Sequence, residues 1–361
     1  MRVAFLSYDH GEYCIRLASA IAGASDVLLL LPAQVARPHV AKLSPAVHYQ
    51  PFVKPRLRQA VAQARTVCNI VGWIRRFRPD VLHLQQGQLW FNLALPLVAG
   101  YPLVVTIHDV AHHPGDRVSE RVPQPVLDLA YRRADEVIVQ APQLKALVSD
   151  RLGIPAERVH VIPHVMLGEG TGRGDHREEA HTILFFGRIW PYKGLDYLIR
   201  AEPAISAAVP DVRIVIAGQG EDLGRYRQMM VHPERFRVIN AEVTDEERAD
   251  LFAQAAVVVL PYIEASQSGV IPVAYDSAKP VVATKVGGLP AMVEDGVTGY
   301  LVPPCDEGAL AAAVIRILRD DGLRHQMGLN AKRKVEAECS PEVIAGQLLT
   351  VYQRAMADRR G

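Results

Sequence analysis

The sequence has little of what marks secreted, membrane-spanning or metal-binding proteins. Its 361 residues include four cysteines, which lie far apart and form no close-spaced pair of the kind used for zinc or dithiol chemistry: Cys14, Cys68, Cys305 and Cys339. The longest apolar runs, such as 26–32 and 255–260, are much shorter than the roughly 20 residues of a membrane-spanning helix. The N-terminal residues show no signal-peptide pattern. We therefore expect a cytoplasmic protein in a reducing compartment.

The chain also has no marked excess of positive or negative charge. The chain has 40 Lys and Arg against 39 Asp and Glu, a formal net charge of +1, and only 6% of its residues are aromatic. It contains no continuous basic tract and no interleaving of basic and aromatic residues typical of RNA-binding or DNA-binding modules. The sequence therefore predicts no nucleic-acid partner, and a nucleotide fits better than a polynucleotide.

What is present is a regular alternation of apolar strands with helices, which is typical of α/β folds with parallel sheets covered on both faces. The length corresponds to about two domains. Residues 168–179 are rich in glycine and charge. We predict a Rossmann-like domain over 1–168, a linker over 169–180, a second Rossmann-like domain over 181–340 and a terminal helix over 341–361.

Two strand-to-helix junctions of the second domain contain glycine. A strand ending near Pro261 is followed by Gln267, Ser268, Gly269 and Val270, where a new helix is expected. The free N–H groups of a first helical turn and its positive dipole end favour an anion, and glycine allows a ligand to approach the backbone. A second such turn covers 286–290. These turns predict a phosphate-binding site.

Two cations precede these turns. The strand 183–186 ends in Gly187 and Arg188, and Lys193 follows five residues after the arginine. A planar guanidinium and a compact ammonium together can bind both phosphates of a diphosphate. Each motif alone is more often an ordinary cap or surface charge, but their order along the chain indicates one site.

With these residues in place, the chain resembles the retaining glycosyltransferases of family 4 (glycosyl transferases group 1), which have the two-domain GT-B fold. The motifs that carry the resemblance are 186–188 with 193–194, 216–220, 280–284 with 286–290, 295–296, 298–299 and 302–304, and more loosely 78–83 and 106–109. The resemblance implies an α/β fold with two doubly wound parallel-sheet domains facing a central cleft. It also implies an N-terminal acceptor domain, a C-terminal donor domain and a last helix that crosses back to the first domain.

The implied reaction moves a sugar from a nucleotide diphosphate sugar of UDP or GDP type to an acceptor hydroxyl, with a phosphate oxygen accepting the proton and no tightly bound cofactor. The acceptor would be a saccharide or a lipid-linked molecule in the synthesis of cell-surface polysaccharide, glycolipid or glycoconjugate. The catalytic residues that we expect are His108, Arg188, Lys193 and Glu264, with Glu264 positioning the donor sugar. The donor-binding residues that we expect are Gly11, Gly187, Gly218, Gly220, Glu242, Val243, Gln267, Ser268, Gly269 and Val270. A strand-end cap remains the alternative for His108, and a plain turn for Gly11.

One position departs from the family pattern, which usually has two glutamates eight residues apart. The position eight residues after Glu264 is Pro272, and the position seven residues before Pro280 is Val273, so neither alignment supplies the second glutamate. If Pro261 and Pro280 are both kept in register with the family, the first glutamate falls on Ala265. Asp276 is the nearest substitute, and we expect it to be solvated. This departure keeps open an inactive sugar-nucleotide-binding or scaffold protein, and the shared architecture keeps open a GT-B-type epimerase. A GT-B phosphorylase would need a pyridoxal lysine environment, and we recognise none.

Two further stretches allow more than one interpretation. His112, His113 and Asp116 match no standard ligand spacing, so we expect no metal. In the basic segment 54–78, arginines alternate with apolar residues: Arg56, Arg58, Arg65, Arg75, Arg76 and Arg78. This pattern describes either a core helix with a solvated face or a helix that lies on the anionic inner face of a membrane.

Overall fold

Two parallel sheets organise the chain, each in its own compact unit. The computed structural model describes residues 1–111, 122–167, 178–220 and 223–359. The first unit contains the described residues up to 165 together with those from 340 onward, and the second contains those from 166 to 339. The boundary thus lies at 165/166. Most of the segment that we expected to be a linker falls outside the described residues, as do His112, His113 and Asp116.

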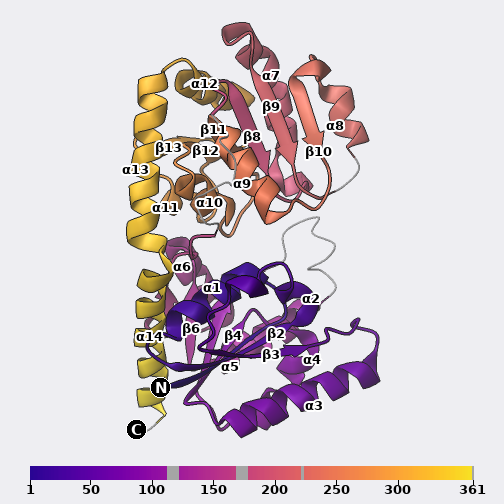
Figure 1. Cartoon of the computed structure of the whole chain (residues 1–361), viewed down its shortest axis with the longest axis vertical. Helices are drawn as coiled ribbons and strands as arrows, with labels where there is room; N and C mark the ends of the chain where they lie inside the picture. Colours follow the sequence, from indigo (N-terminus) through magenta and orange to yellow (C-terminus); the bar gives the residue numbers. More distant parts are fainter. Residues whose placement is uncertain (112–121, 168–177, 221–222, 360–361) are drawn as a thin grey trace. The chain divides into compact units, whose positions relative to one another are not determined.

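The first unit is built on a seven-stranded sheet in the order β3-β2-β1-β4-β5-β6-β7, in which all neighbours are parallel (Figure 1). The strands are β1 (Arg2–Ser7), β2 (Asp26–Pro32), β3 (Val47–Phe52), β4 (Val81–Gln85), β5 (Leu103–Ile107), β6 (Glu136–Val139) and β7 (Val159–Val161). The helices are α1 (Gly11–Ile21), α2 (Ala33–Ala36), α3 (Ala60–Phe77), α4 (Leu89–Leu93), α5 (Gln124–Arg133), α6 (Pro142–Leu152) and α14 (Pro341–Asp358). Five of the seven strands are buried almost throughout, because helices cover both faces of the sheet.

Sequence periodicity did not predict β3. It forms an edge of the sheet, contains Pro51, and has only its two end residues buried. A proline is tolerated at an edge because one side of the strand needs no ladder hydrogen bond. The absence of a continuous apolar run at this edge explains why no strand was predicted there.

The second unit has a six-stranded parallel sheet in the order β10-β9-β8-β11-β12-β13. The strands are β8 (Thr182–Phe186), β9 (Arg213–Ala217), β10 (Phe236–Ile239), β11 (Val257–Leu260), β12 (Val281–Thr284) and β13 (Gly299–Val302). The helices are α7 (Leu195–Ala208), α8 (Gly224–Met229), α9 (Asp245–Gln254), α10 (Val270–Asp276), α11 (Leu289–Met292), α12 (Glu307–Leu318) and α13 (Asp321–Cys339). Separate apolar clusters contain Ile183 and Phe185 in one case and Leu184 in the other, as alternation along a strand requires. Two doubly wound parallel sheets confirm the predicted fold class.

The last helix, α14, belongs to the first unit. It packs against α1 and the strands β4, β5 and β6, and it buries Ile344, Leu348 and Tyr352. The Tyr352 hydroxyl lies 2.6 Å from His83 Nδ1 on β4, and the Arg354 guanidinium lies 3.1 Å from the Glu136 carboxylate on β6. Apolar burial and these polar contacts together hold the helix on the sheet.

Candidate diphosphate and sugar site

The loops at the carboxyl ends of β8 and β9 pack closely on each other. Gly218 follows β9 with a φ of +138°, and a Cβ at this position would clash with the carbonyl group of Gly187, which follows β8. A Cβ at Gly220 would similarly clash with the carbonyl group of Ile189. The close approach of the two loops therefore already requires glycine at Gly218 and Gly220. Contact with a nucleotide is not needed to explain these two glycines.

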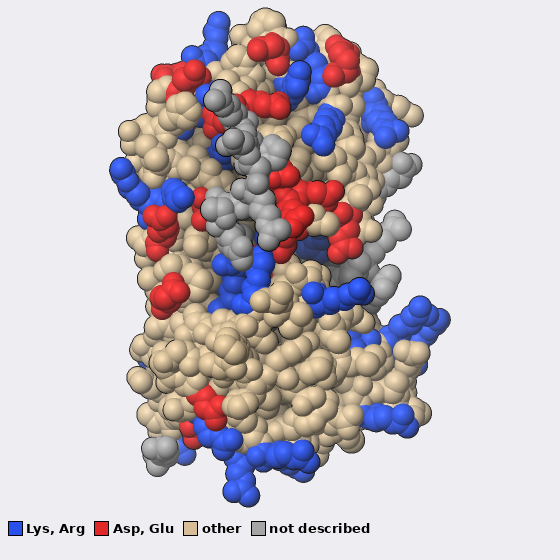
Figure 2. Space-filling view, in the orientation of Figure 1, with Lys and Arg blue, Asp and Glu red and all other residues tan. Residues whose placement is uncertain are grey.

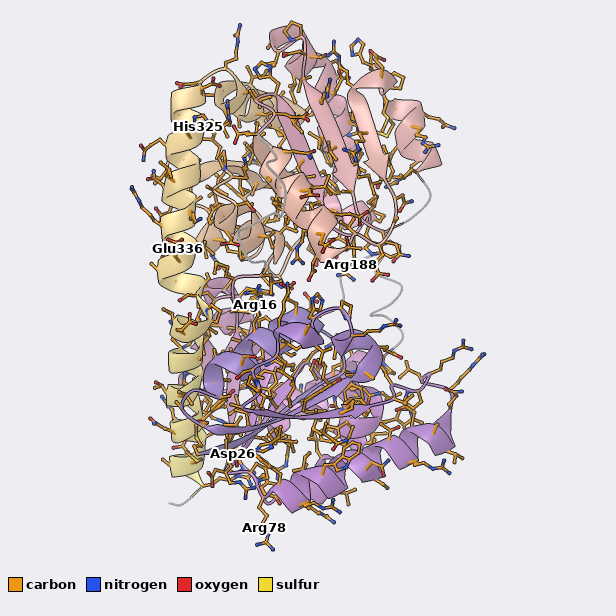
Figure 3. The ribbon with its side chains drawn as sticks, viewed as in Figure 1. Arg16, Asp26, Arg78, Arg188, His325 and Glu336 are labelled. Carbon is orange, nitrogen blue, oxygen red and sulfur yellow. The ribbon has the colours of Figure 1, made fainter. Side chains whose placement is uncertain are left out.

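Arg188 and Lys193 share an aromatic neighbour. Arg188 lies on the exposed loop after β8 (Figure 3), and its guanidinium donates to the Tyr192 hydroxyl at 3.2 Å. Lys193 ends the short 3-10 helix η5 (Pro191–Lys193). Its Nζ lies 3.6 Å from the centroid of the Tyr262 ring and 5.0 Å from that of Tyr192. A cation over an aromatic face is attracted by the ring quadrupole, so the two tyrosines hold both cations at one place.

The segment that carries Lys193 is fixed to the end of β11. Gly194 has a φ of +64° and approaches the carbonyl group of Pro261 so closely that a side chain would not fit. The N–H of Ile263 donates to the Tyr192 carbonyl group at 2.8 Å. Lys193 is therefore positioned by backbone contacts as well as by the tyrosine rings.

The turn after β11 is tied to the same aromatic cluster. The hydroxyl groups of Tyr262 and Ser268 lie 3.4 Å apart, and Ser268 Oγ accepts from the Val270 N–H at 3.3 Å. Gly269 caps α10 with a φ of −67°, an ordinary helical value. One amide of the expected anion site is thus already paired within the turn, while Tyr262 links Ser268 to Lys193.

The remaining residues expected in the donor domain lie on the segments that follow β10 and β11. Glu264 is exposed, Gln267 is half-buried, and Glu242 and Val243 follow β10 just before the capping box of α9. The Oε1 atom of Gln267 is buried without a hydrogen-bond partner among the described residues. Asp276 at the last position of α10 is buried, so the expectation of a solvated side chain there is wrong.

In the first unit, His108 follows β5 and is buried among other rings. Its ring stacks on His10 with centroids 4.1 Å apart and contacts Tyr13 edge-on at 5.2 Å. Its Nε2 lies 2.9 Å from Gln85 Oε1. Burial is the main reason why the pKa of His108 lies well below its ordinary value of 6.5, so the ring is neutral at pH 7. A neutral imidazole can exchange hydrogen bonds with hydroxyl groups but forms no ion pair with phosphate.

Gly11 is the first residue of α1. The carbonyl group of Val35 occupies the space that a Cβ would take. Packing within the first unit is therefore a sufficient reason for this glycine.

Sequence reasoning missed Tyr192 and Tyr262. Each follows a proline, in Pro191-Tyr192 and Pro261-Tyr262; Tyr192 directly precedes Lys193, and Tyr262 lies two residues before Glu264. The repeated Pro-Tyr pair was a usable signal, because aromatic rings next to a conspicuous lysine often stabilise its charge.

Family models match both halves of the chain. "Glycosyl transferase 4-like domain" covers residues 10–164 and "Glycosyl transferases group 1" covers residues 180–320. Among the described residues, no helix has the length and hydrophobicity needed to cross a membrane.

Curated relatives extend the same match. A phosphatidyl-myo-inositol mannosyltransferase of Mycolicibacterium smegmatis is 28% identical, over 95% of this chain and 89% of that protein. A D-inositol 3-phosphate glycosyltransferase of a Nocardioides species is 30% identical, over 78% of this chain and 68% of that protein.

Solved structures share the fold. Sucrose-phosphate synthase of Thermosynechococcus elongatus aligns over 99% of this chain and 100% of its own, with a TM-score of 0.78 and 21% identity. Anabaena HepE in complex with UDP aligns over 98% of this chain and 100% of its own, with a TM-score of 0.72 and 20% identity. The chain therefore belongs to the group 1 glycosyltransferases and has their GT-B fold, as its motifs predicted.

Proposed function

We propose that this glycosyltransferase transfers a hexose from a UDP-type or GDP-type sugar nucleotide to an acceptor hydroxyl, with retention of the anomeric configuration. One observation carries the proposal: Arg188 and Lys193 are held together by Tyr192 and Tyr262 next to the Ser268 turn. Two cations beside a glycine-containing turn suit a diphosphate. The UDP bound to HepE supports a nucleoside diphosphate as ligand.

The cations act on the leaving group. In the proposed reaction, the bond between the anomeric carbon and the diphosphate oxygen breaks, and the oxygen keeps the electron pair. The acceptor oxygen bonds to the anomeric carbon on the same face, and its proton passes to a phosphate oxygen. Arg188 and Lys193 stabilise the negative charge that develops on the diphosphate. Glu264 and His108 position sugar hydroxyl groups, and the backbone around Glu242 and Val243 meets the base.

Ligand-induced stabilisation tests the donor class. We expect UDP or GDP, at about 100 times its dissociation constant, to add about 2.7 kcal/mol of stability, whereas ADP does not. This corresponds to a rise in melting temperature of roughly 5 to 10 °C. A wild-type protein that none of these nucleotides stabilises would contradict the proposal.

Product analysis separates the remaining functions. Transfer to an added acceptor identifies the transferase, and an epimerised sugar nucleotide without acceptor identifies the epimerase. Binding without turnover indicates the inactive sugar-nucleotide-binding protein.

The acceptor belongs to the same proposal. Relatives are named for phosphatidyl-myo-inositol and for D-inositol 3-phosphate, which supports a polyol acceptor that is lipid-linked or soluble and a role in glycolipid or cell-surface polysaccharide synthesis. All four cysteines are thiols, in agreement with a cytoplasmic site of action.

We propose that the first unit contacts an anionic membrane through its basic side chains and not through an apolar face. The apolar face of α3, with Val67, Ile70 and Ile74, packs into the core of the first unit, so it is not available to lipid. The opposite face carries exposed arginines, and Arg78 projects outward after the helix (Figure 3). The described part of the first unit has eighteen Lys and Arg against twelve Asp and Glu. Basic side chains stand along its outer edge at α3 (Figure 2).

We expect the protein to sediment with phosphatidylserine-containing vesicles at low salt and to be released at high salt. Each basic residue near the surface contributes about 1 kcal/mol to the binding free energy, and salt screens this contribution. A variant with glutamine at Arg58, Arg65 and Arg76 should lose this binding. A matched variant with glutamine at the exposed Arg237, Arg319 and Arg333 of the second unit should keep it. Equal sedimentation with neutral phosphatidylcholine vesicles, or none at low salt, would rule out the electrostatic contact.

A further inference from the structure

Two polar side chains lie side by side at the carboxyl ends of β5 and β6. The register pairs Thr106 with Ile138 and Ile107 with Val139, so the next residues, His108 and Gln140, are neighbours. His108 is 2% exposed and Gln140 is 5% exposed. The ends of parallel strands are where ligands bind in open α/β sheets.

Both side chains have unused hydrogen-bonding atoms. Among the described residues, neither Oε1 nor Nε2 of Gln140 has a hydrogen-bond partner, and neither does Nδ1 of His108. Burial is the main cause of the lowered pKa of His108 and of the raised pKa of Tyr13, and Gln140 lies close enough to both side chains to oppose each shift in part. None of these contacts, however, has hydrogen-bond geometry. A buried polar atom without a partner costs about 1 to 3 kcal/mol, and native proteins keep few of them.

A chain of hydrogen bonds determines which ring nitrogen of His108 carries no hydrogen. His83 Nδ1 lies 2.6 Å from the Tyr352 hydroxyl of α14, and the Gln85 amide nitrogen donates to His83 Nε2 at 2.9 Å. Gln85 therefore directs its oxygen at His108 Nε2, which must donate. Burial lowers the pKa of His83 to about 3, so this ring is neutral too. Nδ1 of His108 is left as an acceptor.

We propose that Gln140 and Nδ1 of His108 together bind one ring hydroxyl of a sugar or polyol, so that Gln140 helps to determine sugar specificity. A hydroxyl group accepts one hydrogen bond and donates another, which matches the Gln140 amide N–H and the His108 acceptor. Neither group is charged, so the pair suits a neutral hydroxyl better than phosphate. This inference rests on the proposed function, and it adds a recognition residue to it.

The test uses Gln140→Leu, which removes the amide and keeps a similar volume. Affinities for UDP, GDP, UDP-glucose and GDP-mannose are measured by calorimetry, and acceptor KM values are measured with inositol 3-phosphate and phosphatidylinositol. We expect unchanged affinity for the bare diphosphates and a loss of about 10- to 100-fold for the hydroxyl-bearing ligand. A loss for the sugar nucleotide identifies the donor as the source of the hydroxyl, and a rise in acceptor KM identifies the acceptor.

Melting temperature distinguishes this role from a structural one. Because the amide is unpaired, Gln140→Leu should leave the unliganded protein as stable as wild type or more stable. Gln63→Leu on α3 is the matched control, since the Gln63 amide donates to the Pro55 carbonyl at 2.8 Å. This control should lower the melting temperature and leave every affinity unchanged.

Unchanged affinities and KM values in Gln140→Leu, or a lowered melting temperature that accounts for its losses, would overturn the inference. A wild-type protein that binds no nucleotide would instead overturn the proposed function.

Discussion

Alanine at Lys193 should lower kcat by about 100- to 1,000-fold and leave the melting temperature nearly unchanged. The expected loss is that of one preorganised donor to a developing negative charge, about 3 to 4 kcal/mol of barrier. Arg188→Ala should have a comparable effect, because its guanidinium belongs to the same cluster through Tyr192. Single-turnover kinetics with the donor identified by thermal shift measure both variants.

Substitutions at Tyr262 make this prediction specific. Tyr262→Phe keeps the ring beneath Lys193 Nζ and removes only the hydroxyl contact with Ser268, whereas Tyr262→Leu removes the ring as well. The leucine variant should therefore lose more activity than the phenylalanine variant. Arg200→Ala is the control, because Arg200 is an exposed arginine of α7 that pairs with Asp196. Near-normal transfer by Lys193→Ala or Arg188→Ala would contradict the assignment of the site.

Glutamine at Glu178 should destabilise the second unit by about 3 kcal/mol. The Glu178 carboxylate lies 2.6 Å from Lys279 Nζ and 2.8 Å from Arg324 Nε, and both cations are buried. Removal of one partner from a buried ion pair leaves charge unpaired and costs 3 to 5 kcal/mol. We expect a loss near the lower end of this range, because the Glu178 side chain is 20% exposed and solvent screens its charge. Urea unfolding measures the change.

Acidification should destabilise the second unit in the same way as Glu178→Gln. Burial alone would raise the pKa of Glu178, but its hydrogen bonds and ion pairs with Lys279 and Arg324 outweigh burial and lower the pKa below 4.5. The contribution of the carboxylate to stability is therefore complete above its unfolded pKa near 4.5 and is lost as the pH falls through the lower folded value. Glu338→Gln, which affects an exposed pair with Lys334, should cost less than about 1 kcal/mol. If both variants unfolded at the same urea concentration, the buried cluster would not be stabilising.

Local patterns predicted the fold well, because parallel strands buried on both faces are continuous apolar runs. The stretches 257–260 and 183–186 show this directly, and both are strands in the structure. The half-exposed edge strand β3 lacks this pattern. An edge strand pairs with a single neighbour, here β2, and most of β3 is not buried, so no continuous apolar run marks it in the sequence.

The site was only partly predictable for a related reason. Arg188 and Lys193 could be selected by spacing, but the support beneath Lys193 comes from Tyr262, many residues later in the chain. Gln140 gave no signal at all, since its significance lies in being next to His108 across two strands and in having no partner. Gly218 was selected correctly as a special position, although contact with Gly187 is sufficient to explain it.

The position of α14 has a consequence for synthesis of the protein on the ribosome. The first unit needs α14 to cover β4, β5 and β6, yet the whole second unit is translated before that helix. Until α14 leaves the exit tunnel, the strands β4, β5 and β6 of a nascent chain therefore lack this apolar cover. Premature termination near Cys339 would leave that surface exposed permanently, which makes such fragments candidates for aggregation and for capture by chaperones.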